Sequence, residues 1–136
     1  MAATTLLNEI EKGSKSAQSK KHIIAYHMKH GNATITDLAK QLGLSIPTVS
    51  KLVDELTASG LIKEGGKTET GSGRHPTTYG LNPESCYFVG VDIKNNSVSL
   101  GLMDFGGNII EKQLDVMFAS ENSVENLSHL CEIINK

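Results

Sequence analysis

The chain has 136 residues, 38% of them hydrophobic and 21% charged, which fits a globular protein with one ordinary domain or two small ones. No apolar run approaches the roughly 20 residues of a membrane-spanning helix, and no basic-then-apolar signal pattern begins the chain, so we expect a cytoplasmic protein that does not bind membranes. Residues 1–82 carry ten lysines and arginines against seven carboxylates, whereas residues 83–136 carry three against eight. A net charge of +3 followed by −5, which together make the overall −2, favours a nucleic-acid module joined to a second unit of another kind.

The two cysteines, Cys86 and Cys131, stand far apart and form no CxxC pair. This spacing indicates neither a zinc site nor a disulfide framework, and we expect two buried thiols. Three tyrosines, three phenylalanines and no tryptophan argue against a stacking surface for single-stranded nucleic acid.

Residues 1–15 are predicted to be an N-terminal extension that contains a short amphipathic helix over residues 3–12. Leu6, Leu7 and Ile10 are expected on one side of this helix. Two interpretations stay open: the segment packs on a partner chain, or it frays as chain termini often do.

A longer helix is predicted over residues 16–30 and ends at the glycine that follows. Ile23, Ile24 and Met28 are expected to face inward, with Tyr26 or His27 at the edge of this apolar stripe. Lys20 near the start of this helix is expected either to face a phosphate backbone or to be simply solvated.

Residues 34–60 are predicted to form a helix-turn-helix. Thr36 is expected to cap the first helix, and Gly43 is expected in the turn, where a residue without a Cβ is favoured. The inward face of the first helix is predicted to consist of Leu38, Ala39 and Leu42.

The second helix of this motif is predicted to begin after Ser45, a suitable N-cap. Pro47 is tolerated in the first turn because the amides there lack helical partners. Apolar residues then recur at i, i+3, i+4 and i+7, which predicts one buried stripe. The stripe consists of Val49, Leu52, Val53 and Leu56.

The polar start of this second helix is the predicted DNA-binding element. A helix that enters the major groove uses its N-terminal turns, where short donors and cations reach bases and phosphates. The alternative is a two-helix corner packed on a core, which apolar spacing alone does not exclude. The candidate DNA-binding residues of this helix are Ser45, Pro47, Thr48, Ser50 and Lys51.

A β-hairpin wing is predicted directly after the second helix. A short strand over residues 61–63 and a returning strand over residues 77–81 flank a segment rich in Gly, Ser and Thr. Gly and Pro near Arg74 favour an extended backbone from which the arginine reaches a narrow A·T-rich minor groove. The alternative is that the segment is only a linker. The candidate phosphate or groove contacts of the wing are Lys67, Arg74 and His75.

The composition changes at residues 82–84, and β-rich segments follow. Three strands are predicted over residues 86–93, 97–104 and 108–118, separated by tight-turn sequences. Strict alternation predicts one buried face for the middle strand. That face consists of Val98, Leu100 and Leu102.

A helix capped by Ser123 is predicted to follow the strands, with Cys131 in the core. Three strands and one helix bury little surface, and units this small are usually marginal alone. We therefore expect residues 83–136 to begin a larger domain, or two chains to cover each other. The apolar side of the helix is predicted to carry Val124, Leu127, Leu130, Cys131 and Ile134.

With these motifs, the sequence resembles the ROK family (repressor, open reading frame, kinase), and within it the sugar-responsive repressors of the N-acetylglucosamine and xylose type. The resemblance spans about residues 16–136 and rests on the helix-turn-helix, on GSGRHPTTYGLNP across the wing and on YFVGVDIKNNSVSLGLMDFGGNII after it. It implies an α+β fold with a winged helix-turn-helix domain over residues 16–82. Residues 83–136 would then be the first β-meander and helix of an actin-like, ribonuclease-H-like ROK domain, truncated here, which in this family binds a sugar or sugar phosphate.

Kinase members of the ROK family have an aspartate followed by Gly-Gly-Thr, where bare backbone approaches ATP phosphates. Asp92 matches this aspartate, but residues 93–96 read Ile-Lys-Asn-Asn, and their side chains would crowd a phosphate. This departure favours the repressor branch of the family.

The sequence thus predicts a DNA-binding regulator, expected to repress carbohydrate genes as a homodimer on a roughly palindromic operator in double-stranded DNA. A sugar or sugar-phosphate effector is expected only where the rest of the second domain is present. The alternatives are a sugar kinase or its remnant, and a dimerising fragment without effector response. No catalytic, cofactor-binding or metal-binding residue is predicted, and we expect the protein not to be an enzyme.

Overall fold

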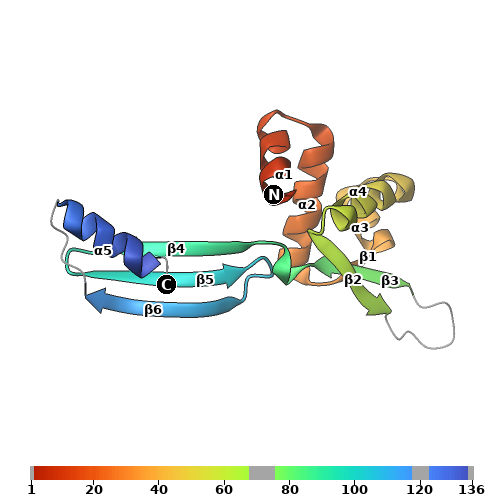
Figure 1. Ribbon diagram of the computed structural model, residues 1–136. Helices are drawn as coiled ribbons and strands as arrows, with labels where there is room; N and C mark the ends of the chain where they lie inside the picture. Colours follow the sequence, from red (N-terminus) through yellow and green to blue (C-terminus); the bar gives the residue numbers. More distant parts are fainter. Residues whose placement is uncertain (1, 68–75, 118–122, 135–136) are drawn as a thin grey trace. The chain divides into compact units, whose positions relative to one another are not determined.

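The computed structural model describes residues 2–67, 76–117 and 123–134 (Figure 1). The chain divides into two compact units, Met1–Cys86 and Tyr87–Lys136, and each is described by itself.

The first unit combines four helices with a small antiparallel sheet whose strand order is β1-β3-β2 (Figure 1). The predicted hairpin is present as β2 and β3, whereas the two-residue strand β1, which completes the sheet, was not predicted. Helices followed by such a hairpin make a winged helix-turn-helix. The elements are α1 (Ala2–Glu11), α2 (Lys15–His30), β1 (Ala33–Thr34), α3 (Ile35–Leu42), α4 (Ile46–Ala58), β2 (Ile62–Lys67) and β3 (Thr77–Leu81).

The core of this unit is built by the inner faces of α2, α3 and α4 together with the start of β2. The predicted stripe of α4 is confirmed, because all four of its residues are buried. Gly43 has φ +64 and ends α3 in the left-handed conformation, as expected for the turn of the motif. The largest fully buried side chains of this unit are Ile23, Leu38, Val49, Val53, Leu56, Leu61 and Ile62.

The first helix, α1, packs on α2. Leu6 is buried and Ile10 is half-buried, whereas Leu7 is 60% exposed, so only part of the apolar side of this helix is covered. A helix that packs at the edge of a small unit buries only a narrow strip of its surface.

The inner face of α2 also differs from the prediction. Ile23 is buried as expected, but His27 is buried where Met28 had been predicted, and Met28 is 61% exposed. His27 follows Ile23 by four residues, the spacing that keeps two side chains on one helical face. Its Nδ1 lies 2.9 Å from the carbonyl oxygen of Gly31, to which the neutral ring donates, while Nε2 is buried without a partner among the described residues.

Burial of His27 makes the stability of the first unit depend on pH. Burial lowers the pKa of His27 from its ordinary value of 6.5, and the bond to Gly31 offsets only part of this effect. The unfolded chain therefore takes up a proton at a higher pH than the folded chain does. The contribution of the neutral ring to stability is fully present above pH 6.5 and is lost as the pH falls through the lower folded-state pKa.

We accordingly expect the denaturant midpoint to fall between about pH 7.5 and about pH 5.5, and to fall less in His27→Gln. Urea unfolding followed by circular dichroism at the two pH values measures this. His22, on the exposed side of the same helix, offers the matched control His22→Gln. An equal loss of midpoint in wild type and His27→Gln would contradict the role of His27.

The cap of α3 is Thr34, not Thr36 as predicted. The Thr34 hydroxyl accepts the amide of Asp37 at 3.1 Å, and the Asp37 carboxylate accepts the amide of Thr34 at 3.2 Å, which completes a capping box. The hydrogen bonds from the Thr34 hydroxyl and amide lower the pKa of Asp37. Because the helix begins at Ile35, Thr36 lies within its first turn and is exposed.

Thr34→Ala is expected to lower the free energy of unfolding by about 0.5–2 kcal/mol, because it leaves a helix-terminal amide without its acceptor. Thr36→Ala is the control and is expected to change stability by no more than about 0.5 kcal/mol. Urea unfolding of both variants distinguishes the two positions, and a larger effect at Thr36 would contradict the capping assignment.

The second unit is an antiparallel sheet of order β4-β5-β6 with one helix, α5, against one face (Figure 1). The predicted three strands and the helix are thereby confirmed, and the Ser123 hydroxyl caps the helix by accepting the amide of Asn126 at 3.2 Å. A short 3₁₀ turn, Pro83–Ser85, precedes this unit. The elements are β4 (Tyr87–Ile93), β5 (Ser97–Asp104), β6 (Ile109–Met117) and α5 (Val124–Ile134).

Val98 and Ile133 form the buried centre of the second unit, and the rest of the helix-facing side is only partly covered. The prediction that Cys131 is a core residue was wrong, because its thiol side chain is exposed, and Cys86 is only half-buried. The rotation of α5 about its axis explains the difference, because this helix turns Leu130 and Ile133, three residues apart, toward the sheet.

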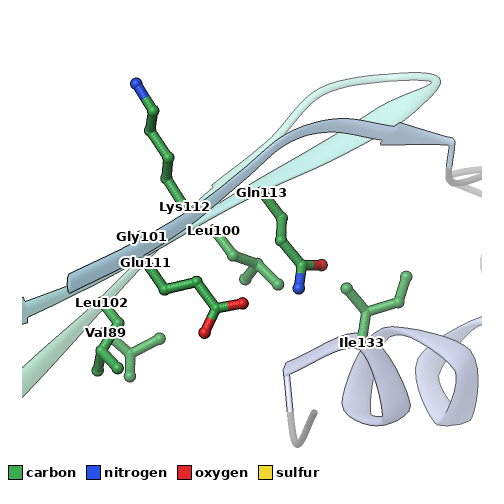
Figure 2. A pocket seen from close by; sticks show the side chains of 8 residues that line it. All are labelled: Val89, Leu100, Gly101, Leu102, Glu111, Lys112, Gln113 and Ile133. Atoms are coloured by element: carbon green, nitrogen blue, oxygen red, sulfur yellow. The ribbon is translucent and has the colours of Figure 1, made fainter. Parts of the chain in front are cut away.

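A hollow of about 160 Å³ lies between this face and α5 (Figure 2). Leu100, Glu111 and Gln113 point from the sheet toward the side on which Ile133 lies, whereas Lys112 points to the opposite side. The face is therefore mixed, with a carboxylate and an amide beside aliphatic side chains.

Candidate nucleic-acid interface

The start of α4 is fixed by the cap that the sequence predicted. The hydroxyl of Ser45 accepts the amide of Thr48 at 3.3 Å and lies 2.7 Å from the hydroxyl of Thr48. Pro47 lies in the first turn, where its missing amide costs no helical hydrogen bond. The two hydroxyls therefore order the leading turn of α4, so its side chains are held on a rigid element.

The side chains of this leading turn are open to solvent. Pro47 and Thr48 are exposed, and the side chain of Lys51 is 80% exposed, whereas Ser50 is half-buried beside the apolar stripe. The arrangement offers a hydroxyl and a cation within one turn, which suits contacts with base edges and phosphates. Contact of these residues with DNA stays a prediction.

Lys20 does not have the role considered for it in the sequence. Its Nζ lies 2.8 Å from Oε2 of Glu55, and only 16% of its side chain is exposed. This ion pair joins α2 to α4, and the hydrogen bond from Lys20 lowers the pKa of Glu55. The ammonium is thus engaged within the protein, and Lys20 is a positioning residue for α4 rather than a phosphate contact.

The two sides of α4 differ in charge. On the side of the wing, burial raises the pKa of Tyr79, and the nearby carboxylates of Glu64 and Asp54 raise it further. The side chains around Tyr79 are therefore acidic. On the side of α2, Lys51 lies 4.0 Å from Glu55, whose nearer partner is Lys20.

The wing is an antiparallel hairpin whose register has one irregularity. Glu64 pairs with Tyr79, and the register shifts before Gly66, which has φ +98 and accepts a hydrogen bond from the Thr78 hydroxyl at 2.8 Å. A bulge of this kind increases the local twist of the hairpin. Among the predicted wing contacts, Lys67 ends β2 but its side chain lies outside the described part of the chain, and Arg74 and His75 lie outside the described residues altogether.

Two wing glycines make room for a side chain from another segment. A Cβ added at Gly65 or at Gly80 would fall on the side chain of Asn32, which directly precedes β1. Asn32 therefore lies against the hairpin where both glycines leave space. This contact was not predicted from the sequence. Glycines inside predicted strands are the feature that could have indicated it, because they often mark a close approach by another segment.

In the second unit, Asp92 is paired with a cation of its own chain. Nζ of Lys94 lies 3.9 Å from Oδ2 of Asp92 and 3.3 Å from Oδ1 of Asp115. Asp115 has φ +51 at a register irregularity of the sheet, and its amide donates to the Ser99 hydroxyl at 3.0 Å. Lys94 thus holds the turn after β4 to β6.

Within residues 2–67, 76–117 and 123–134, no three histidine, cysteine or carboxylate side chains gather as a metal site. In the same ranges, no helix has the length and apolar character needed to cross a membrane.

Comparison with known proteins shows which proteins this chain is similar to. Residues 17–63 match the family described as winged helix-turn-helix DNA-binding. The chain is 29% identical over 101 residues to the xylose repressor of Caldicellulosiruptor bescii, a match that covers 74% of this chain and 25% of that protein. It is 24% identical over 120 residues to the xylose repressor of Staphylococcus xylosus, covering 86% of this chain and 30% of that one.

A solved structure has the same fold. It is a ROK family transcriptional regulator described as a homolog of the E. coli MLC protein, with a TM-score of 0.53 and 22% identity over 76% of this chain and 26% of that chain. The chain spans about a quarter of the length of these relatives.

The described fold and the matched family define a winged helix-turn-helix DNA-binding protein. Within that class, the resemblance drawn from the sequence is confirmed: the chain is similar to part of the proteins named as xylose repressors.

Proposed function

We propose that this chain binds operator DNA as the N-terminal portion of a transcriptional repressor of carbohydrate genes. The observation that carries the proposal is the capped start of α4, where Thr48 and Lys51 are solvent-exposed on a helix that three other elements hold in place. The relatives named as xylose repressors support the regulatory role and its link to sugars.

In the proposed complex, the leading turn of α4 lies in the major groove. Thr48, Ser50 and Lys51 meet base edges or position the helix, and Ser45 and Pro47 border the groove. On the wing, Lys67 meets a phosphate, while Arg74 and His75 approach the minor groove, where a narrow A·T-rich stretch attracts an arginine.

The proposal extends to assembly and to the second unit. Residues 16–82 act as the DNA-binding domain, and residues 83–136 form the opening β-meander and helix of an actin-like domain. A sugar or sugar-phosphate effector is expected only where the rest of that domain is present. Val89, Val91 and Ile93 of β4 are each more than 40% exposed, as is expected of a sheet face that further chain covers. A homodimer in the cytoplasm, reading two half-sites one helical turn apart, fits this arrangement.

Fluorescence anisotropy with labelled A·T-rich duplexes over a salt series tests DNA binding. The expected result is an affinity that falls steeply as salt rises, since phosphate contacts release counterions. A mixed-sequence duplex is the control for sequence preference. Absence of binding at low salt, or an affinity that does not depend on salt, would overturn the proposal.

A further inference from the structure

A hollow of about 270 Å³ lies between α2 and α4, on the side of α4 that carries Lys51. Its rim combines two lysines with three hydroxyls from two different helices, beside one leucine and one carboxylate. The lining residues are Lys15, Ser16, Ser19, Thr48, Lys51, Leu52 and Glu55.

The carboxylate in this hollow does not repel an anion as a free one would. Glu55 is held by Lys20 at 2.8 Å, and its second oxygen lies 4.0 Å from Lys51. Both oxygens of Glu55 therefore have a cationic neighbour, and Lys15 is a further cationic residue of the lining. Lys15 is exposed and takes part in no ion pair within the described ranges.

The hydroxyls give the hollow short donors on the α2 wall. Ser16 is exposed and Ser19 is half-buried, three residues apart on one helical face. The Ser14 hydroxyl already accepts the amide of Ala17, so α2 begins as an ordered, capped helix. The partial positive charge of its first turn adds to that of Lys15.

We propose that this hollow, with Lys15, Ser16 and Ser19 as its α2 wall, holds a backbone phosphate of the DNA strand that flanks the groove entered by α4. The inference rests on the proposed function and adds a second anchor on a different helix. Contacts from two helices to one strand fix the orientation of the first unit on the duplex, which contacts from α4 alone fix less firmly. Phosphate contacts of this kind position a protein on the duplex without reading sequence.

Lys15→Gln tests the anchor in the full chain, and Lys29→Gln is the matched control. Both lysines are exposed on α2, but Lys29 lies 14 residues further along, about 21 Å away at the helical rise per residue. Binding to a mixed-sequence duplex of about 30 base pairs is measured by fluorescence anisotropy over a salt series. Lys15→Gln is expected to make the slope of log affinity against log salt shallower by about one, while Lys29→Gln leaves it unchanged.

The double variant Ser16→Ala, Ser19→Ala is expected to weaken binding without changing the slope, because hydroxyls donate hydrogen bonds but carry no charge. An unchanged slope in Lys15→Gln, or an equal change in Lys29→Gln, would overturn the anchor. Either result would leave DNA binding by the wild type intact, whereas failure of the wild type to bind would instead refute the proposed function.

Discussion

Replacing Leu56 with alanine is expected to lower the free energy of unfolding by about 2–5 kcal/mol. Leu56 is 1% exposed and belongs to the stripe by which α4 packs into the core of the first unit. The substitution removes most of a buried side chain and leaves a cavity that neighbouring helices fill only in part. Small domains are stable by about 5–15 kcal/mol, so the loss would leave a large fraction of the first unit unfolded under mild denaturant.

Leu7→Ala is the control for this prediction. It deletes the same atoms from a helix of the same unit, but Leu7 is 60% exposed, and we expect a change within about 0.5 kcal/mol. Urea unfolding followed by circular dichroism measures both. Equal effects of the two substitutions would show that α4 is not packed as described.

Replacing Lys51 with alanine is expected to weaken DNA binding by about 1–3 kcal/mol on the preferred duplex, the effect of losing a contact with a base edge. Its side chain is 80% exposed, so its loss leaves no buried group unpaired and the fold intact. Binding is measured by anisotropy on a duplex selected by the wild type from a random library, and on a scrambled duplex of equal length. The loss should be larger on the selected duplex.

Lys29→Ala serves as the matched control, because it removes the same charge from an exposed position in the last turn of α2 rather than from α4. A comparable loss in both variants would indicate a general charge effect. An unchanged affinity in Lys51→Ala would remove Lys51 from the interface, and a loss that is equal on the two duplexes would reassign it to a phosphate.

The part of the fold that depends on local patterns could be predicted from the sequence. The stripe of α4 repeats at helical spacing, Ser45 is a strong cap, and Gly43 marks the turn, so local preferences and burial agree. Turn sequences separate the strands of the second unit, and these strands and β3 were predicted to within one residue at each end. The first strand of the wing was predicted too short, because β2 continues to Lys67. Local signals of this strength survive in the folded chain because tertiary packing reinforces them.

Features that depend on which surfaces meet could not be predicted. Thr34 and Thr36 are both acceptable caps, and the choice between them follows from the strand β1, which pairs with β3 far along the chain. The ion pair of Lys20 with Glu55 requires α2 and α4 to cross at one place. No periodicity within either helix contains that information.

The same limit explains the side chains that were placed on the wrong face. A helix at the edge of a small unit buries only a narrow line of side chains, so Leu7 of α1 and Cys131 of α5 face solvent although both lie at apolar helical spacing. His27 is the reverse case, because a polar ring is buried once its Nδ1 bonds the carbonyl of Gly31. The width of the buried face is set by the number of packed neighbours, which composition does not reveal.

For the candidate site, the sequence predicted α4 and the polar residues at its start. The structure adds the contacts that hold this part of the helix in place. Ser45 and Thr48 order the first turn, and Glu55 ties α4 to α2 through Lys20. These contacts make the leading edge rigid, which a helix needs in order to keep its side chains in register with base edges.

The claim on which the account rests is that the start of α4 faces duplex DNA. Amide chemical shifts of the ¹⁵N-labelled chain, recorded while an A·T-rich duplex is added, test it most directly. The account predicts that the largest changes fall on residues 46–51 and on the first turns of α2, with little change in α5. Large changes confined to the second unit, with residues 46–51 unaffected at saturating DNA, would contradict it.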